Sequence, residues 1–331
     1  MNVKEEWKTK GFVDEPIDPS LDLKQEIRRL CHEKDAIILA HYYTVPEIQD
    51  IADFVGDSLA LAREAAKTTA QVMVMCGVHF MAETCKLLSP DKTVLCPDLT
   101  AGCSLADSCR AEDLKKYKEE HPGYQVVSYV NTTAAVKALT DVVVTSGNAQ
   151  KVIDTFPKDA KLIFGPDYNL GNYINSVTGR EMLLWQGGCH VHERFSVEEI
   201  LKLKREHPQA VVMAHLECKA PVLAVADVKG STATMLHYAQ QHPEVGEFIV
   251  ATEAGILHEM QRTCPNQTFL PVPPEVTEGG LGCSCTECEY MKKNTLAKIY
   301  NALKYGWPAV EVEPDIAREA VKPIERMLTL S

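Results

Sequence analysis

The stretch Ala36-Ile37-Ile38-Leu39-Ala40-His41-Tyr42-Tyr43 decides the fold, because its plan of an apolar run ending in polar residues occurs three times in the chain. The second copy is Gln125–Asn131 and the third is Ala210–Glu217. Each copy is followed, several dozen positions later, by one cysteine of the set Cys103, Cys189 and Cys288. Three modules that each supply one thiol predict a shared metal site with three protein ligands and an open position, which is typical of a catalytic metal centre.

Short apolar runs alternate with helical patterns through all three copies. This alternation is typical of βαβ units and parallel sheets. Strands are predicted at 36–40, 71–76 and 93–96 in the first copy, at 125–130, 141–145, 161–165 and 182–185 in the second, and at 210–214, 247–251 and 267–270 in the third. The sequence therefore predicts an α/β fold with three αβα domains and parallel sheets.

Charged helical stretches that close on His-Pro mark the predicted module boundaries. We expect a first module at 1–110 with a loosely held N-terminal arm, a second at 111–195 and a third at 196–290. Residues 291–331 carry helical patterns but no strand, so we expect these C-terminal helices to pack back on an existing domain, the first module.

Composition describes a globular chain of 331 residues, with 45% hydrophobic and 24% charged residues. The net charge of −12 argues against a nucleic-acid partner, which requires a basic stripe. It does not argue against an anionic small molecule, because a site inside an acidic protein can be locally positive. The sequence has no apolar run long enough to cross a membrane and begins without a secretory signal, so we expect a cytoplasmic protein with no membrane partner.

Polar side chains stand where the predicted strands end. In parallel α/β sheets, ligands bind beyond the carboxyl ends of the strands. This rule places seven residues at binding edges: His41, Tyr43, Tyr129, Asn131, Ser146, His215 and Glu217. A single histidine or tyrosine at a strand end is more often an ordinary polar contact, but recurrence in three modules favours a shared site.

Hydroxyl groups form a second pattern at the predicted starts of helices: Ser58, Ser146 and Thr232. Serine and threonine are common there as ordinary helix caps. Helix N-termini with free N–H groups also bind phosphate and carboxylate groups. Because the three hydroxyls accompany the polar strand ends, we favour anion binding.

The chain has 12 cysteines, and most of them require no chemical role. Six lie in apolar or helical surroundings and are interpreted as small buried hydrophobic residues: Cys31, Cys76, Cys85, Cys96, Cys218 and Cys264. The densest group, Cys283-Ser284-Cys285-Thr286-Glu287-Cys288, taken alone suggests zinc or a redox disulfide. A zinc ribbon needs a second C-x-x-C pair, and this sequence has none. A distributed site is therefore favoured, and soft thiolate ligands favour an iron–sulfur cluster.

A series of short motifs makes a family resemblance specific. In order along the chain they are His41-Tyr42-Tyr43, Gly56-Asp57-Ser58, Gly77-Val78-His79-Phe80-Met81-Ala82-Glu83-Thr84, Tyr129-Val130-Asn131-Thr132, Val144-Thr145-Ser146, Pro166-Asp167-Tyr168-Asn169-Leu170-Gly171, Trp185-Gln186-Gly187-Gly188-Cys189-His190-Val191-His192-Glu193, His215-Leu216-Glu217-Cys218, Gly230-Ser231-Thr232 and Cys285-Thr286-Glu287-Cys288. With these motifs the chain resembles the quinolinate synthase family of NAD biosynthesis over essentially its whole length.

The resemblance implies one [4Fe–4S] cluster with an open iron, held by one cysteine per domain around a pseudo-threefold centre. Carried over by position, the ligands are Cys103, Cys189 and Cys288. The C-x-C-x-x-C spacing departs from the usual pattern of the family, so Cys285 is the alternative to Cys288. Leu216 also stands where the family often has proline.

The family condenses iminoaspartate with dihydroxyacetone phosphate to quinolinate, with loss of phosphate and water. The resemblance implies catalytic roles for His41, Tyr43, His215 and Glu217. It implies substrate contacts for ten residues: His41, Ser58, Tyr129, Val130, Asn131, Ser146, His215, Leu216, Glu217 and Thr232. It further implies a functional link to an aspartate oxidase or dehydrogenase that produces iminoaspartate.

Two alternatives remain open at this stage. One is another three-cysteine [4Fe–4S] enzyme of similar architecture, such as a reductive dehydroxylase, which would depend on an electron donor. The other is a zinc-binding or redox-regulated protein without catalytic activity, built on Cys283, Cys285 and Cys288. Metal content after anaerobic purification distinguishes the second alternative from an iron–sulfur enzyme.

Overall fold

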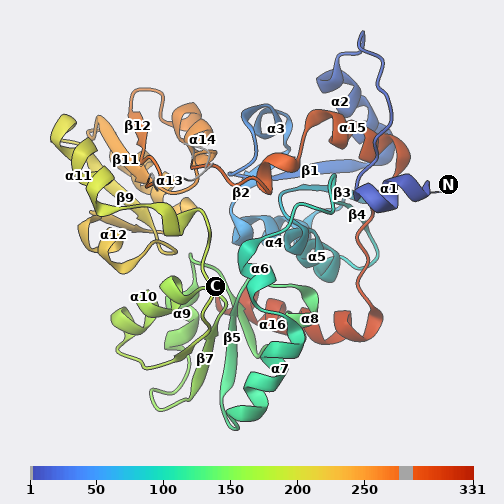
Figure 1. Ribbon diagram of the computed structural model, residues 1–331. Coiled ribbons are helices and arrows are strands. Elements are labelled where there is room, and N and C mark those ends of the chain that lie inside the picture. The colour runs from blue at the N-terminus through green and yellow to red at the C-terminus, as the bar shows by residue number, and fades with distance from the viewer. Residues whose placement is uncertain (1–2, 276–285) are drawn as a thin grey trace.

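A computed structural model describes residues 3–275 and 286–331 and shows three α/β lobes around a common centre (Figure 1). Each lobe is built on a four-stranded sheet, with the orders β2-β1-β3-β4, β6-β5-β7-β8 and β10-β9-β11-β12. In every sheet, then, the second strand lies outside the first and the last strand forms the other edge. All the paired strands run parallel. The predicted α/β fold with three αβα domains is confirmed.

The elements of the first lobe are α1 Glu5–Lys10, α2 Leu23–Lys34, β1 Ala36–His41, α3 Pro46–Ile51, β2 Phe54–Gly56, α4 Ser58–Lys67, β3 Val72–Cys76, α5 His79–Leu88 and β4 Thr93–Leu95. Those of the second are α6 Ser104–Ser108, α7 Ala111–Glu120, β5 Gln125–Tyr129, α8 Ala134–Lys137, β6 Val142–Val144, α9 Ala149–Asp154, β7 Leu162–Gly165, α10 Tyr168–Thr178 and β8 Leu183–Leu184.

The third lobe contains the 3₁₀ turn η1 His192–Arg194, then α11 Val197–Glu206, β9 Val211–His215, α12 Ala220–Val225, β10 Val228–Gly230, α13 Thr232–Gln241, β11 Glu247–Ala251, α14 Ile256–Thr263 and β12 Thr268–Pro271. The chain ends with the 3₁₀ turn η2 Met291–Lys293 and the helices α15 Leu296–Tyr305 and α16 Pro314–Leu330. The domain boundaries proposed from the sequence stay a prediction.

An aspartate at the same place in each lobe ties the first strand to the second. Asp53, Asp141 and Asp227 each precede the second strand of their sheet and accept a hydrogen bond from a backbone N–H of the first strand, at 2.7, 2.7 and 2.8 Å. The donor lies 15 residues before its aspartate in all three cases. The repeat therefore extends from the strand pattern to single hydrogen bonds.

The strands β2 and β10 are absent from the sequence prediction, and both are edge strands of three residues. Phe54-Val55-Gly56 and Val228-Lys229-Gly230 have no apolar run to signal a strand. They become extended by pairing with β1 and β9, where Phe54 lies beside Leu39 and Val228 beside Met213. Such pairing is a tertiary contact, and a periodicity argument detects only the local pattern.

The N-terminal arm is not loosely held, and that expectation is wrong. The Trp7 side chain is only 2% exposed, and its ring lies 5.1 Å from that of Tyr305 at the end of α15. Asn301 in α15 donates a hydrogen bond from Nδ2 to the carbonyl of Glu15 at 3.0 Å. Apolar burial and backbone hydrogen bonds thus hold the arm, although its sequence is mostly charged.

The two C-terminal helices pack in different places. Helix α15 lies against α2 of the first lobe, while α16 lies against β6 and α8 of the second and also contacts α5 of the first. The side chains of Ala320, Ile324 and Met327 in α16 are fully buried. Helix α16 therefore joins two lobes through one apolar face.

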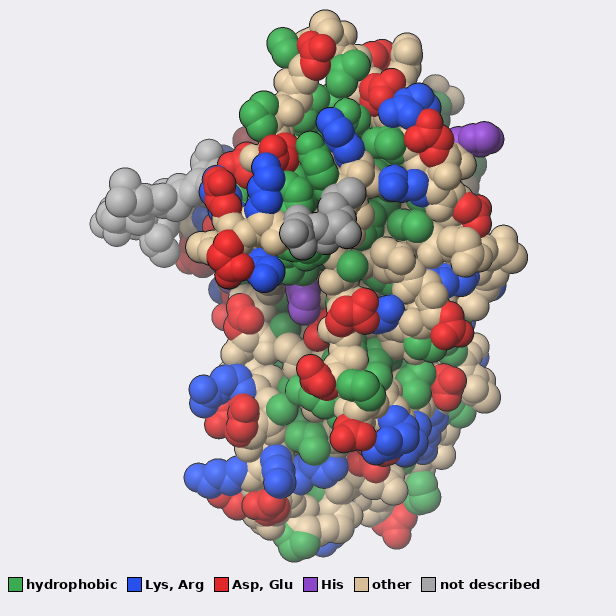
Figure 2. Space-filling view, turned by 90° about the vertical axis from the view of Figure 1, so that its right-hand side faces the viewer, with side chains coloured by type: hydrophobic (Ala, Val, Ile, Leu, Met, Phe, Trp, Pro, Cys, Tyr) green, Lys and Arg blue, Asp and Glu red, His purple; other side chains and the backbone are tan. Residues whose placement is uncertain are grey.

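The surface carries both signs of charge. Figure 2 shows Lys and Arg side chains interspersed with Asp and Glu over one face of the molecule. Among the described residues, no helix combines the length and the apolar character that a membrane crossing requires.

Lys137 in α8 is a fully buried lysine in the second lobe. Its Nζ donates hydrogen bonds to the carbonyls of Val130 and Thr132, the first at 2.8 Å. These hydrogen bonds stabilise the turn that follows β5. Burial lowers the pKa of the Lys137 ammonium to about 8, although the charge of Glu83 opposes this change.

A pH-dependent contribution of Lys137 to stability follows from this pKa. Between about pH 8 and pH 10.5 the unfolded chain keeps a proton that folded Lys137 has lost, so the free energy of unfolding should rise with pH in this window. Relative to Lys137→Met the gain should reach about 3 kcal/mol. Urea unfolding of both proteins at several pH values measures it, with the exposed-site variant Lys115→Met as control. A constant difference between wild type and Lys137→Met would contradict the prediction.

Candidate active site between the three lobes

A cavity lies where the three lobes meet, with an open space of about 700 Å³ including its mouth. The first strand of each sheet points its carboxyl end at this cavity. His41 ends β1, Tyr129 ends β5 and His215 ends β9, and all three side chains line the cavity. The lobes thus bring the binding edges of three separate sheets together.

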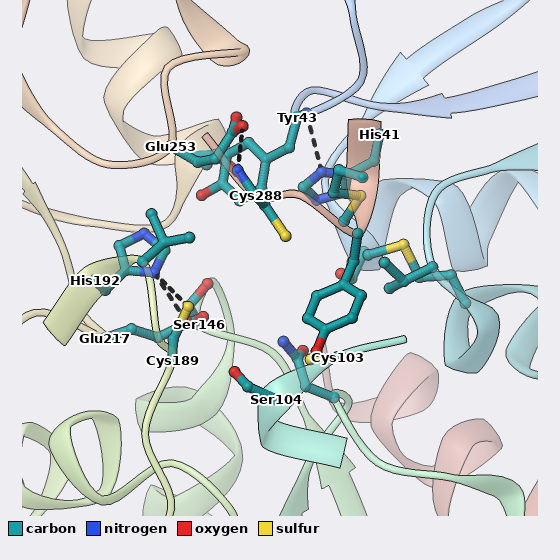
Figure 3. Close-up of a pocket in the computed structure, with 18 of the residues that line it drawn as sticks. His41, Tyr43, Cys103, Ser104, Ser146, Cys189, His192, Glu217, Glu253 and Cys288 are labelled. Carbon is teal, nitrogen blue, oxygen red and sulfur yellow. Dashed lines mark hydrogen bonds and ion pairs between the residues drawn. The ribbon is translucent and has the colours of Figure 1, made fainter. Parts of the chain in front are cut away.

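Most of the residues proposed from the sequence line this one cavity: His41, Tyr43, Ser58, Cys103, Tyr129, Asn131, Ser146, Cys189, His215, Glu217, Thr232 and Cys288. Val130 and Leu216 do not line it, because both side chains pack in the apolar core, at 2% and 5% exposure. Figure 3 shows the three cysteines around the same space, with His41 and Tyr43 on one side and His192 and Glu217 on the other.

His41 and His215 share one local arrangement in the first and third lobes. The Nδ1 atom of His41 accepts the backbone N–H of Tyr43 at 3.2 Å, and that of His215 accepts the N–H of Glu217 at 3.3 Å. An accepting Nδ1 leaves the proton of the neutral ring on Nε2. Burial lowers the pKa of His41 to about 3 and that of His215 to about 4, so both rings are neutral near pH 7.

Glu217 is the buried carboxylate of the cavity, 4% exposed. Its Oε1 accepts the hydroxyl of Tyr129 at 2.5 Å, and its Oε2 lies 3.1 Å from Nδ1 of His192. Burial opposes ionisation, but His192, His215 and the Tyr129 hydrogen bond outweigh it and hold the pKa of Glu217 well below its usual range. Burial and the charge of Glu217 raise the pKa of Tyr129, which stays protonated and keeps its role as donor.

A chain of hydrogen bonds continues from His192 to the first lobe. His192 Nε2 lies 2.9 Å from the hydroxyl of Thr252, and that hydroxyl lies 2.7 Å from the Tyr43 hydroxyl. Together with Glu217 and Tyr129, these groups form a continuous path across three lobes. Such a path orients each of its members and can carry a proton along hydrogen bonds.

Replacing Thr252 with valine should interrupt this path while keeping the side-chain shape. We expect turnover to fall about tenfold, because one buried hydrogen-bonding link of about 1.4 kcal/mol is lost in the reacting complex. Steady-state kcat at saturating substrate measures the effect. The control is Thr263→Val, at the end of α14, whose hydroxyl bonds, among the described residues, only within its own helix and to the neighbouring cysteine. An unchanged kcat in Thr252→Val would contradict the prediction.

The three cavity cysteines are half-buried thiols that line the cavity, one from each part of the chain. Burial raises the pKa of Cys103 to about 12, that of Cys288 to about 11, and that of Cys189 well above its usual value. Such thiols become thiolates when a metal cation replaces the proton. Three soft donors around one cavity match the ligands of an iron–sulfur cluster with an open position.

A second donor group in the same cavity shares one of these thiols. Donor atoms of Cys189, His192 and Glu217 lie within 4.8 Å of one another. His192 Nδ1 is 3.1 Å from both the Cys189 sulfur and a Glu217 oxygen. A carboxylate and an imidazole therefore lie beside the thiol, where they can act on a molecule bound next to it.

Groups suited to an anionic ligand also line the cavity. Ser58 and Thr232 are the first residues of α4 and α13, which are capped by Asp57 and Ser231. Because the caps satisfy other N–H groups, the two hydroxyls are free to face the cavity. Within the described part of the chain, the buried Oδ1 of Asn131 has no hydrogen-bond partner. A buried polar atom of this kind is suited to contact a ligand.

Residues of the site that the sequence analysis did not single out include His192, Thr252 and Glu253. A signal existed for His192, since Cys189-His190-Val191-His192 places an imidazole one turn after a cysteine. Thr252 and Glu253 follow β11, at the position that Gly77 and Val78 hold after β3. Their importance depends on contacts with other lobes, which the sequence pattern does not contain.

The other nine cysteines are Cys109, which is buried, and two groups. The six interpreted as buried hydrophobic residues are all buried, which confirms that interpretation of their environment. Cys283 and Cys285, and the glycines just before them, lie outside the described residues. Of the two candidates for the third ligand, Cys288 lies among the described residues and lines the cavity. Its choice over Cys285 stays a prediction.

Comparison with known proteins gives one consistent result. A family model described as "Quinolinate synthetase A protein" matches residues 25–329. The curated protein "Quinolinate synthase" of Trichormus variabilis is 52% identical over 311 residues, which cover 94% of each chain. The protein of the same name from Chloroherpeton thalassium is 51% identical over 318 residues, covering 96% of this chain and 97% of its own.

Proposed function

This chain belongs to the quinolinate synthetase A family and is an enzyme with quinolinate synthase function in NAD biosynthesis, and from this premise we propose its substrates and site chemistry. The proposed reaction joins iminoaspartate and dihydroxyacetone phosphate into quinolinate, one phosphate and two waters, which balances all atoms without an external oxidant or reductant. The imine would come from an aspartate oxidase or dehydrogenase. The proposal is supported chiefly by the convergence of three thiols and one buried carboxylate on a single cavity.

Cys103, Cys189 and Cys288 would hold the [4Fe–4S] cluster expected for this family, and the donor set fits it because all three are half-buried thiols that line one cavity. Bound there, the cluster would supply a Lewis-acidic iron with an open position, which eases departure of a hydroxyl group. The remaining steps fall to side chains of the chain itself.

His41 and His215 are suited to donate from Nε2 to oxygen atoms of the substrates. Both rings are neutral, and both have the other nitrogen occupied by a backbone N–H. Ser146 lies 3.3 Å from the Nε2 of His215 and extends this donor edge. Tyr43 stays protonated, because burial raises its pKa, and would exchange a proton through its hydroxyl during imine formation.

Glu217 would act as the general base for protons on carbon or nitrogen of the condensing intermediate. It is an ionised carboxylate inside a cavity, and Tyr129 and His192 hold its two oxygens in place. Its lowered pKa keeps it ionised and so able to accept a proton, although it also makes the carboxylate a weaker base than a free one. The proton that Glu217 takes up can pass along the hydrogen bonds to His192 and Thr252.

Ser58 and Thr232 would hold the carboxylates or the phosphate, with Asn131 and Tyr129 orienting the intermediate between them. Their hydroxyls open two helices whose N-termini favour negative charge. Two anionic substrates would therefore find hydroxyl and N–H donors in the same cavity.

Anaerobic assay for quinolinate tests the proposal. The protein is purified without oxygen and incubated with dihydroxyacetone phosphate and freshly generated iminoaspartate, and quinolinate is quantified by mass. Product formation without any electron donor would support the proposed reaction. Strict dependence on an electron donor would favour a reductive enzyme, and a colourless zinc protein without product would overturn the proposal.

A further inference from the structure

A buried ion pair beside the cavity has no part in the chemistry described so far. The Glu253 side chain is fully buried after β11, and its Oε1 lies 2.8 Å from Nζ of Lys292, which is 17% exposed and belongs to η2. Burying a carboxylate and an ammonium group is costly unless further hydrogen bonds satisfy both. The remaining partners of this pair therefore indicate what it holds in place.

The partners come from three separate parts of the chain. Glu253 Oε1 accepts the backbone N–H of Cys288 at 2.9 Å, and its Oε2 accepts that of Gly255 at 2.7 Å. Lys292 donates to the carbonyl of Tyr43 in the first lobe at 2.7 Å. One carboxylate and one ammonium thus connect the loop after β1, the loop after β11 and the segment that carries Cys288.

The first-lobe loop and the third-lobe loop approach closely at this joint. A Cβ atom built on Gly255 would lie 2.8 Å from Cα of Tyr43 and 2.9 Å from the carbonyl oxygen of Tyr42. Both contacts are with backbone atoms, which cannot move aside as a flexible side chain can. The ion pair therefore spans a tight backbone contact between two lobes.

The backbone of Cys288 is held on both sides by other parts of the chain. The carbonyls of Cys103 and Cys189 accept N–H groups of their own following turns, at 2.9 and 3.0 Å. The carbonyl of Cys288 likewise accepts the N–H of Lys292 at 3.2 Å. In addition, the backbone N–H of Cys288 donates to the carboxylate of Glu253, which follows β11 of the third lobe. Thr286, two residues earlier, accepts the N–H of Ala254 at 3.2 Å, so the segment is attached twice to this loop.

We propose that Glu253, paired with Lys292, is a positioning residue that holds Cys288 in place as the third ligand of the metal centre (Figure 3). The inference rests on the proposed cluster, in which Cys288 is a ligand. Cys288 lies after the third lobe in the chain, shortly before η2. The Glu253 carboxylate holds its backbone against the third lobe. Through Lys292 the same carboxylate fixes the loop that carries Tyr43.

The test compares Glu253→Met, Lys292→Met and the double variant with the wild type, all as full chains. Methionine removes the oxygen that accepts the Cys288 N–H, which a glutamine would retain. In Glu253→Met we expect iron release to a ferrous chelator under anaerobic conditions to be roughly 10- to 100-fold faster, as for loss of partners that orient metal ligands. In the metal-free chain, alkylation of Cys288 should accelerate while that of Cys103 and Cys189 stays unchanged. Glu244→Met, at an exposed site, is the matched control.

The double variant separates positioning from stability. It leaves no unpaired buried charge, so its unfolding midpoint should return toward that of the wild type. Iron release should nevertheless stay fast, because the acceptor for the Cys288 N–H is still lost. Wild-type iron release in Glu253→Met, equal acceleration of all three thiols, or recovery of iron retention in the double variant would each overturn the positioning role. Full iron in Cys288→Ser would instead show that the proposed ligand set is wrong.

Discussion

Cys189→Ser is expected to remove the metal centre, and turnover with it. The thiolate is a soft ligand, and a serine oxygen in the same buried place is a hard, protonated one that binds iron of a sulfide cluster poorly. Iron content should fall from about four per chain to near background. Quinolinate formation should fall by about a thousandfold or more, because the open Lewis-acid position is lost.

Cys103→Ser and Cys288→Ser should give the same result, since each removes one of three ligands. Iron and sulfide content after anaerobic reconstitution, together with the visible absorbance of the protein, measures the effect. Cys264→Ser is the control, because Cys264 is buried in the third lobe away from the cavity. Retention of iron in the Cys288 variant alone would make Cys285 the third ligand.

Glu217→Gln is expected to stop turnover while leaving the metal centre in place. Glutamine has nearly the same shape and can still accept the Tyr129 hydroxyl. It cannot take up a proton, and its NH₂ group would face His192 in place of a carboxylate oxygen. The loss of a positioned general base should lower kcat by about 10²- to 10⁴-fold.

Parallel measurement of iron content and kcat decides how this result is interpreted. Wild-type iron with a large loss of kcat agrees with the acid–base role. Loss of iron in Glu217→Gln would instead make Glu217 part of the metal site, together with Cys189 and His192. Glu247→Gln, at an ion pair on the surface of the same lobe, should leave both values unchanged.

Much of the fold could be predicted because its signals are local. The apolar runs that become β1, β5 and β9 alternate with helical patterns in every lobe, and such periodicity depends only on neighbouring residues. The two short edge strands could not be predicted, since Phe54–Gly56 and Val228–Gly230 are extended by their partner strands. The packing of the charged N-terminal arm likewise depends on aromatic residues near the other end of the chain.

The sequence by itself determined a three-module α/β protein with histidine, tyrosine and glutamate at strand ends, because strand ends and helix starts are read from local patterns. Only the tertiary structure decided how those edges combine. Tyr43 meets Thr252 across 209 residues of sequence, and Cys288 meets Glu253 across 35. These contacts join residues that no local pattern relates, and burial then sets their protonation states. The physical reason is that hydrogen bonding and desolvation depend on distance in space, whereas periodicity depends on distance along the chain.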